Sequence, residues 1–428
     1  MRLNLELAKD EVVRVFGPAR ITVLRGSIVI LGAIYTSGES VEINVYRSYA
    51  VKGVEDSLVE IRLGEGGSIE MPSAGEEVLD TWMSVADEIV SLGGTPVAFV
   101  MGPTDAGKSS FTALLLNRAL VKGLKPGVID ADIGQADVGP PGFVSATLVD
   151  RKILWLRWLR PQYMRFVGNV TPYRLEKRII TAIVDLRHIL VRNGAQLIAV
   201  DSDGWVYGLQ ALEYKVEAIR ALRPDALVVI GDESLGAMIE RMLKGFKMRI
   251  YTVKSPAVVW ARDREDRRLL RTEGYRRFFE GAKVRKVKLD EIGVIGSCLY
   301  TGTLLPPERL EELARALGVR VVAASETSET LVVVTEGSPR ADALERLGRE
   351  KHVYVIHKGD EKGLYVAVLG PDMEEKAPGV LLNVNYETGE AEILTSYEGE
   401  IGGIIIGSLK LNVDAGFEEA GRVQRCPL

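Results

Sequence analysis

One short segment limits the possible folds of this 428-residue chain more than any other. The apolar run 97–101 leads directly into Gly102-Pro103-Thr104-Asp105-Ala106-Gly107-Lys108-Ser109-Ser110, and a helical pattern follows over 111–122. A strand, the spacing G-x-x-x-x-G-K-[ST] and a helix together predict a loop that binds phosphate. Because such a loop joins a buried strand to a helix, it also predicts an α/β core.

Each residue type in this loop has a physical role in holding a nucleotide. Gly102 and Gly107 let the backbone N–H groups approach phosphate oxygens at a helix start, where the helix dipole favours anions. Lys108 supplies a point charge to the outer phosphates, and the Ser109 hydroxyl is suited to bind Mg²⁺. We therefore expect the whole segment from Gly102 to Ser110 to bind a nucleotide together with magnesium.

The rest of the chain divides into three predicted domains. Continuous apolar runs at 127–130, 196–201, 226–230 and 249–253 are typical of parallel strands that are covered on both faces. Residues 1–75 and 285–428 instead carry short β-branched runs with turn signals. We predict a central domain over 76–284 with a doubly wound, mostly parallel sheet, flanked by β-rich N-terminal and C-terminal domains.

Composition and cysteine spacing narrow the class further. There are 54 basic and 59 acidic residues, so a nucleic-acid partner requires a local basic patch. No apolar stretch reaches membrane-spanning length and no signal-peptide layout is visible, which predicts a soluble cytoplasmic protein without membrane contact. Cys298 and Cys426 show no CxxC spacing, so we expect neither a disulfide nor a zinc site.

Acidic side chains follow two of the predicted strands, at the edge where such sheets bind ligands. Asp130 and Asp132 end one strand, and Asp201-Ser202-Asp203-Gly204-Trp205 ends another. Of Asp130 and Asp132, one carboxylate can hold Mg²⁺, and one can accept a proton from an attacking hydroxyl. The alternatives are an Asx turn that caps the strand for the first segment and a core position for Trp205.

Two segments are locally basic. Residues 254–288 contain twelve basic and five acidic residues, and Arg267 and Arg271 are four apart, so a helix would place them on one face to grip a phosphoryl group. Residues 151–175 have six basic residues and no acid, interleaved with Trp155, Trp158, Tyr163 and Phe166. This pattern suits single-stranded nucleic acid. A solvated basic helix and a packed aromatic core are the respective alternatives.

Taken in order, these motifs resemble the polynucleotide 5′-hydroxyl kinases of the Clp1/Grc3 family, in an archaeal form. The set also includes G-N-V-T-P at 168–172 and G-Y-R-R-F-F at 274–279. The resemblance implies transfer of the ATP γ-phosphate to the 5′-hydroxyl of RNA, or of DNA. It further implies a place in RNA processing or repair, with RNA-processing proteins as candidate partners.

The family's site residues can be carried over by position. Its D-x-x-Q matches Asp132 and Gln135, which implies that Asp132 contacts Mg²⁺ and acts as general base beside the catalytic Lys108. Its clasp T-x-G-W matches Ser202, Asp203, Gly204 and Trp205, with serine in place of threonine. Its lid R-x-x-x-R matches Arg267 and Arg271, although Arg262, Arg264 and Arg268 allow other registers. The residues expected to bind substrate are Gln135, Ser202, Asp203, Gly204, Trp205 and Arg262.

Two other functions remain open at this point. The first is an ATP-binding scaffold subunit of an RNA-processing complex that catalyses nothing. The second is a small-molecule kinase, for a nucleoside for instance. The complete set of loop, carboxylate, clasp and lid favours an enzyme, and the flanking β domains and the basic aromatic stretch do not suit a small-molecule kinase.

Overall fold

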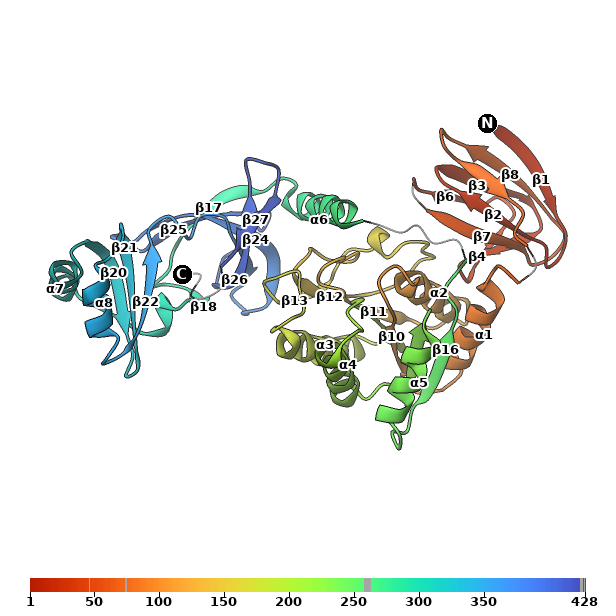
Figure 1. Ribbon diagram of the computed structural model, residues 1–428. Helices are drawn as coiled ribbons and strands as arrows, with labels where there is room; N and C mark the ends of the chain where they lie inside the picture. Colours follow the sequence, from red (N-terminus) through yellow and green to blue (C-terminus); the bar gives the residue numbers. More distant parts are fainter. Residues whose placement is uncertain (46, 74, 258–262, 424–425, 427) are drawn as a thin grey trace. The chain divides into compact units, whose positions relative to one another are not determined.

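The computed structural model describes residues 1–45, 47–73, 75–257, 263–423, 426 and 428 (Figure 1). Their contacts form two compact units. The first unit comprises Met1–Gly139, Val144–Gln162 and Pro172–Arg267; the second unit comprises Pro140–Phe143, Tyr163–Thr171 and Arg268–Leu428. The domain boundaries expected at 75 and 284 stay a prediction.

The first unit begins with two antiparallel sheets that share one apolar core. Their strands alternate buried and exposed side chains, as in β3, where Ile21 and Val23 point inward. The first sheet has the order β1 (Arg2–Leu7), β8 (Ser57–Leu63), β3 (Ala19–Arg25), β6 (Ser40–Ile43). The second has the order β5 (Ala33–Thr36), β4 (Ser27–Ile30), β7 (Ser48–Gly53), β2 (Val12–Phe16), β9 (Ser68–Glu70).

The α/β core of this unit is a mostly parallel sheet. Its strand order is β12 (Phe143–Leu148), β11 (Pro126–Ala131), β14 (Leu197–Ser202), β10 (Val97–Met101), β15 (Ala226–Ile230), β16 (Arg249–Val253). Only β12, which the sequence did not predict, pairs antiparallel among these six. The predicted fold class is confirmed. Since β10, β11 and β14 are adjacent and parallel, the loops after them meet at one edge.

Helices connect the strands of this sheet (Figure 1). They are α2 (Lys108–Val121), α3 (Glu176–Arg192), α4 (Leu209–Leu222) and α5 (Glu233–Met242), while α1 (Leu79–Val90) precedes β10 and contacts α2. In α3 the buried residues Ile179, Ile183 and Leu186 recur at helical spacing, which is the stripe that packs on the sheet.

The second unit contains two further sheets. The larger has the order β17 (Lys283–Lys288), β25 (Glu390–Thr395), β24 (Glu375–Asn385), β23 (Leu364–Leu369), β26 (Gly403–Asn412), β18 (Gly293–Ile295), with β27 (Glu418–Arg422) on β26. The smaller has the order β19 (Thr303–Leu304), β20 (Arg320–Glu326), β21 (Thr330–Glu336), β22 (His352–His357). This unit also contains β13 (Tyr163–Phe166) and the helices α7 (Pro307–Leu317) and α8 (Ala341–Leu347).

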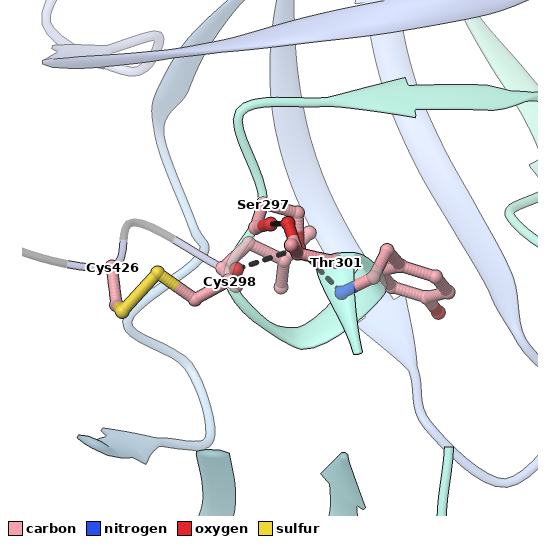
Figure 2. The surroundings of a disulfide bond; sticks show 6 residues. Ser297, Cys298, Thr301 and Cys426 are labelled. Atoms are coloured by element: carbon pink, nitrogen blue, oxygen red, sulfur yellow. Dashed lines mark hydrogen bonds between the residues drawn. A yellow bond between two sulfur atoms is a disulfide. The ribbon is translucent and has the colours of Figure 1, made fainter. Parts of the chain in front are cut away.

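The two cysteines form a disulfide, so the expectation that neither would be paired is wrong. Cys298 and Cys426 are bonded although 128 residues separate them in sequence (Figure 2). Beside them, the carbonyl oxygen of Leu428 accepts hydrogen bonds from the N–H of Cys298 and from the Ser297 hydroxyl, both at 2.6 Å. The spacing rules describe local motifs and contain no information on cysteines brought together by a sheet.

Within the described ranges, no helix is both long enough and apolar enough to cross a bilayer.

Candidate active site

The predicted phosphate loop lies between a fully buried strand and a helix. β10 ends at Met101 and α2 begins at Lys108. Gly107, the residue before the helix, has a φ of 103°, which favours glycine. A Cβ atom there would lie 2.9 Å from the ring of Trp82, so glycine suits both the turn and the approach of that ring. The N–H groups at this helix start are suited to bind phosphate oxygens.

The side chain of Lys108 is almost completely buried in this loop, with 7% exposed. Its Nζ atom donates a hydrogen bond to the carbonyl oxygen of Pro103 at 2.9 Å. The ammonium group therefore lies over the loop backbone. Because the lysine side chain is flexible, a change of rotamer can move the ammonium group from this carbonyl oxygen to a bound phosphate.

Two carboxylates end adjacent parallel strands beside the loop. Asp130 on β11 and Asp201 on β14 lie in register, and each is 2% exposed. Asp130 accepts hydrogen bonds from the N–H groups of Asp132, Asp137 and Val138 at 3.2, 2.7 and 2.8 Å. Burial, with Asp201 nearby, raises the pKa of Asp130 well above its ordinary value. Asp130 thus shapes the segment that follows the strand.

Asp201 is the carboxylate that faces the loop serine. Burial raises the pKa of Asp201 to about 7, while a hydrogen bond with the Ser109 hydroxyl and the charge of Lys108 act in the opposite direction. Its Oδ1 atom is buried and has no hydrogen-bond partner among the described residues. The sequence indicated no role for Asp201; the available signal was its place at the carboxyl end of a strand next to the loop strand.

Asp132 is held by the turn that follows β11. Its Oδ1 atom accepts hydrogen bonds from the N–H groups of Gly134 and Gln135 at 3.1 and 2.8 Å. Burial and the nearby Asp203 raise the pKa of Asp132, whereas Lys108 opposes the rise. The structure therefore places Asp132 within electrostatic reach of Lys108, with its carboxylate oriented by the backbone.

The clasp residues Ser202 and Asp203 are 1% and 4% exposed, so they support the site from inside. Asp203 forms an ion pair with the buried Lys215 at 2.9 Å. It also accepts hydrogen bonds from the Tyr214 hydroxyl and from the N–H of Trp205, both at 2.9 Å. These contacts fix the backbone that presents Trp205, the half-buried member of the clasp.

Gly204 brings the clasp against the phosphate loop. A Cβ atom at this position would lie 2.5 Å from the Thr104 hydroxyl oxygen and 2.8 Å from the Thr104 nitrogen. Any side chain would therefore push the two segments apart. The glycine of the clasp is required by this close approach of two backbones.

The lid arginines lie on α6 (Arg264–Phe279). Arg267 belongs to the first unit, and its guanidinium lies 3.1 Å from the carboxylate of Asp105 in the phosphate loop. The Gln135 side chain donates a hydrogen bond of 3.4 Å to the carbonyl oxygen of Arg267. Arg271 belongs to the second unit, where it forms an ion pair of 2.5 Å with Glu419. Arg262 lies outside the described residues.

A cavity of about 670 Å³ joins the phosphate loop to the N-terminal β domain. From the core it is lined by residues that the sequence indicated, among them Lys108, Asp132 and Gln135. From the other side it is lined by residues that the sequence did not indicate, including Arg14, Arg47, Tyr49 and Trp82. Strand patterns do not show which edge of a sandwich faces a neighbouring domain, so no sequence signal marked these residues.

The basic aromatic stretch does not form one surface. The ring of Trp155 lies beneath two guanidinium groups, those of Arg47 at 4.3 Å and Arg157 at 5.1 Å. Phe166 is instead a core residue of the second unit, packed on Phe143 with the ring centroids 4.8 Å apart. The core alternative therefore applies to Phe166, and nucleic-acid binding by this stretch stays a prediction.

Comparison with known proteins points to one family. A family model described as the P-loop of the mRNA cleavage and polyadenylation factor CLP1 matches residues 102–281. The match begins at the first glycine of the phosphate loop and extends through Asp132, the clasp and α6. Over these residues, the chain matches the Clp1 family. The resemblance stated from the motifs is confirmed.

Named proteins similar to this chain occur in archaea and in animals. A polyribonucleotide 5′-hydroxyl-kinase of Pyrococcus furiosus is 26% identical over 72% of this chain and 84% of the relative. One of Thermococcus kodakarensis is 27% identical over 82% and 97%. The polyribonucleotide 5′-hydroxyl-kinase Clp1 of Rattus norvegicus is 31% identical over 48% of this chain and 54% of its own length.

The Clp1 fold is also found among solved structures. Clp1p in a Clp1p–Pcf11p complex has a TM-score of 0.65 to this chain, with 14% sequence identity. The similarity covers 96% of this chain and 98% of the solved one. It therefore extends beyond the α/β core to both β-rich regions.

Proposed function

We propose that this Clp1-family protein is an ATP-dependent kinase that phosphorylates the 5′-hydroxyl of RNA. The observation that carries the proposal is the position of Asp132, which is oriented by two backbone N–H groups and lies within electrostatic reach of Lys108. A carboxylate fixed in this way can accept the proton of an attacking hydroxyl. The names of the archaeal relatives, which match over most of their length, support RNA as the acceptor.

The phosphate loop would hold the donor. Residues Gly102 to Ser110 offer the backbone N–H groups for the ATP phosphates, and Lys108 supplies a charge for the γ-phosphoryl in transfer. Arg267, which lies on Asp105 of the same loop, adds a second positive charge at the site. With the acceptor hydroxyl at Asp132, positioning and electrostatics supply most of the acceleration.

The residues near Ser109 suit magnesium. The Ser109 hydroxyl and the Asp201 carboxylate supply the hard oxygen ligands that this ion prefers. A bound cation would give the buried Oδ1 of Asp201 the partner that it lacks among the described residues. Asp132 lies at the same sheet edge and can contribute a further oxygen. When bound, the ion neutralises charge on the phosphates. We propose Ser109 and Asp201 as its principal ligands.

The family also bears on partners. A solved complex joins Clp1p to Pcf11p, and we propose that this chain likewise works beside an RNA-processing protein. We further propose that it acts in the cytoplasm, on RNA ends that carry a 5′-hydroxyl.

The test is transfer of γ-labelled phosphate from ATP to matched 5′-hydroxyl RNA, DNA and nucleoside acceptors. We expect label on RNA, and a loss of about a hundredfold or more in Lys108→Ala and in Asp132→Asn. Lys122→Ala is the matched control, because Lys122 is exposed just after the far end of α2. ATP binding without transfer to any acceptor would establish the scaffold function instead, and preference for the nucleoside would establish a small-molecule kinase.

A further inference from the structure

Three aromatic rings form a row that leads from the clasp to the surface of the first unit. Tyr214 is 3% exposed and stacks on Trp205, with ring centroids 6.0 Å apart and an interplanar angle of 28°. Trp205 meets Tyr173 edge to face at 6.3 Å and 81°. Tyr173 is 45% exposed. The row thus has a buried inner end and an open outer end.

The inner end of the row is tied to the active site. The Tyr214 hydroxyl and the N–H of Trp205 both donate to the carboxylate of Asp203. Asp203 precedes Gly204, which lies against Thr104 of the phosphate loop. A strand of nucleic acid whose 5′ end reaches the loop can therefore follow this row outward.

The outer end carries a positive charge. The guanidinium carbon of Arg174 lies 5.3 Å from the ring centroid of Tyr173. Arg174 has a φ of 67°, a left-handed conformation that long side chains seldom adopt. Its N–H donates to the Glu176 carboxylate at 3.0 Å, which helps to hold this conformation. An exposed arginine kept in an unfavourable conformation beside an exposed ring points to a ligand.

We infer that Tyr173 and Arg174 form an outer subsite for single-stranded RNA, on the 3′ side of the nucleotide that is phosphorylated. A base would stack on the exposed ring of Tyr173, and Arg174 would contact a backbone phosphate. This inference rests on the proposed function and deepens it. Any base can stack on tyrosine, and arginine contacts to phosphate carry no sequence information. The subsite should therefore favour longer acceptors over shorter ones, whatever their base sequence.

The subsite favours a single strand over a duplex. In a duplex each base already stacks on its neighbours, so its π-face is covered and cannot reach a tyrosine. Over residues 173–178, the exposed basic residues Arg174, Lys177 and Arg178 outnumber the one acid, Glu176, which suits a polyanion.

The experiment compares acceptors of different length. For a 5′-hydroxyl RNA of six nucleotides, Tyr173→Ser should raise KM about tenfold, because stacking on one aromatic ring contributes about that much to affinity. For a nucleoside 3′-monophosphate, KM should stay unchanged, as should kcat for both acceptors. Tyr173→Phe keeps the ring and should behave like the wild type. Tyr207→Ser is the matched control, since Tyr207 is an exposed tyrosine outside the row.

Arg174→Gly separates binding from folding. Glycine accepts a positive φ without strain, so this variant should be at least as stable as the wild type while binding RNA more weakly. Its affinity should also fall less steeply with salt, by the slope expected for about one phosphate contact. Loss of stability together with loss of binding would show a merely structural role.

Direct binding distinguishes this inference from the proposed function. Fluorescence anisotropy of a labelled six-nucleotide RNA measures the subsite without catalysis. An equal effect of Tyr173→Ser on both acceptors, or unchanged affinity for the six-nucleotide RNA, would overturn the subsite. If the wild-type protein phosphorylates no acceptor but Tyr173→Ser still lowers the affinity for RNA, the subsite stands and the kinase proposal fails.

Discussion

The Nζ atom of Lys215 lies 2.9 Å from a carboxylate oxygen of Asp203, and the two side chains are 0% and 5% exposed. The same Nζ atom donates to the carbonyl oxygen of Asp203 at 3.0 Å. Burial lowers the pKa of Lys215, and the Asp203 carboxylate opposes that change. The buried lysine thus holds Asp203 in place, and Asp203 directly precedes Gly204, the clasp glycine that lies against the phosphate loop.

Removal of this lysine should destabilise the first unit. Lys215→Met leaves the Asp203 charge buried without its ion-pair partner, a loss of about 3–5 kcal/mol. The four tryptophans among the described residues, Trp82, Trp155, Trp158 and Trp205, lie in the first unit, so tryptophan fluorescence during urea unfolding reports on that unit. Lys122→Met, at an exposed position, should leave the transition unchanged. An unaltered midpoint in Lys215→Met would show that the pair contributes nothing to stability.

Gly204→Ala should weaken ATP binding. The added Cβ would meet the Thr104 nitrogen and hydroxyl at 2.8 and 2.5 Å, so either the clasp or the loop must move. We expect a Kd for ATP at least about tenfold higher, measured by calorimetry, since a displacement of this size disturbs a positioned loop. Lys122→Ala is the control, because Lys122 is exposed just after the end of α2 that lies away from the loop. Equal affinities in both variants would contradict the close approach.

Asp201→Asn should affect nucleotide binding only when magnesium is present. The substitution keeps the shape of the side chain but removes the charge that a hard cation prefers. ATP affinity should fall about tenfold or more in magnesium and stay near the wild-type value in EDTA. A similar loss under both conditions would assign Asp201 a structural role. In the absence of metal, the free energy of unfolding of Asp201→Asn should be no lower than that of the wild type, because the variant removes a buried charge.

Arg267→Ala should lower kcat more than it changes the KM for ATP. The Arg267 guanidinium lies at the phosphate loop, and arginines that act on a transferring phosphoryl group contribute strongly to rate. We expect a loss of about a hundredfold or more in steady-state assays. Arg268→Ala, at the next position of α6, should lose far less. Equal losses of kcat in Arg267→Ala and Arg268→Ala would show that neither arginine has a specific role in the transfer.

The disulfide should stabilise the second unit. It closes a segment of 128 residues, and a crosslink across so long a loop contributes about 2–5 kcal/mol. Mass spectrometry after alkylation, with and without reductant, measures whether both thiols are blocked. The Cys298→Ser/Cys426→Ser protein should melt at a lower temperature, while its tryptophan-detected unfolding stays the same. Full alkylation without reductant would rule out the bond.

Much of the site could be predicted because it depends on patterns along the chain. Continuous apolar runs marked β10, β11 and β14, and the parallel arrangement brought Lys108, Asp132 and the clasp to one edge. The remaining features depend on distances in space. Neither the exposure of Tyr173 nor the pairing of Cys298 with Cys426 follows from local spacing. For Asp201, the strand end was visible, but its place against Ser109 required the register of β14.

Trp82 gives the protein an optical signal of its own. Its indole is 2% exposed, lies against Gly107, lines the cavity and donates a hydrogen bond to the carbonyl oxygen of Lys254. A tryptophan at the wall of the nucleotide site responds to charge and water beside it. The emission spectrum of the unlabelled chain should therefore change when the cavity fills, so occupancy can be followed in real time without a modified nucleotide.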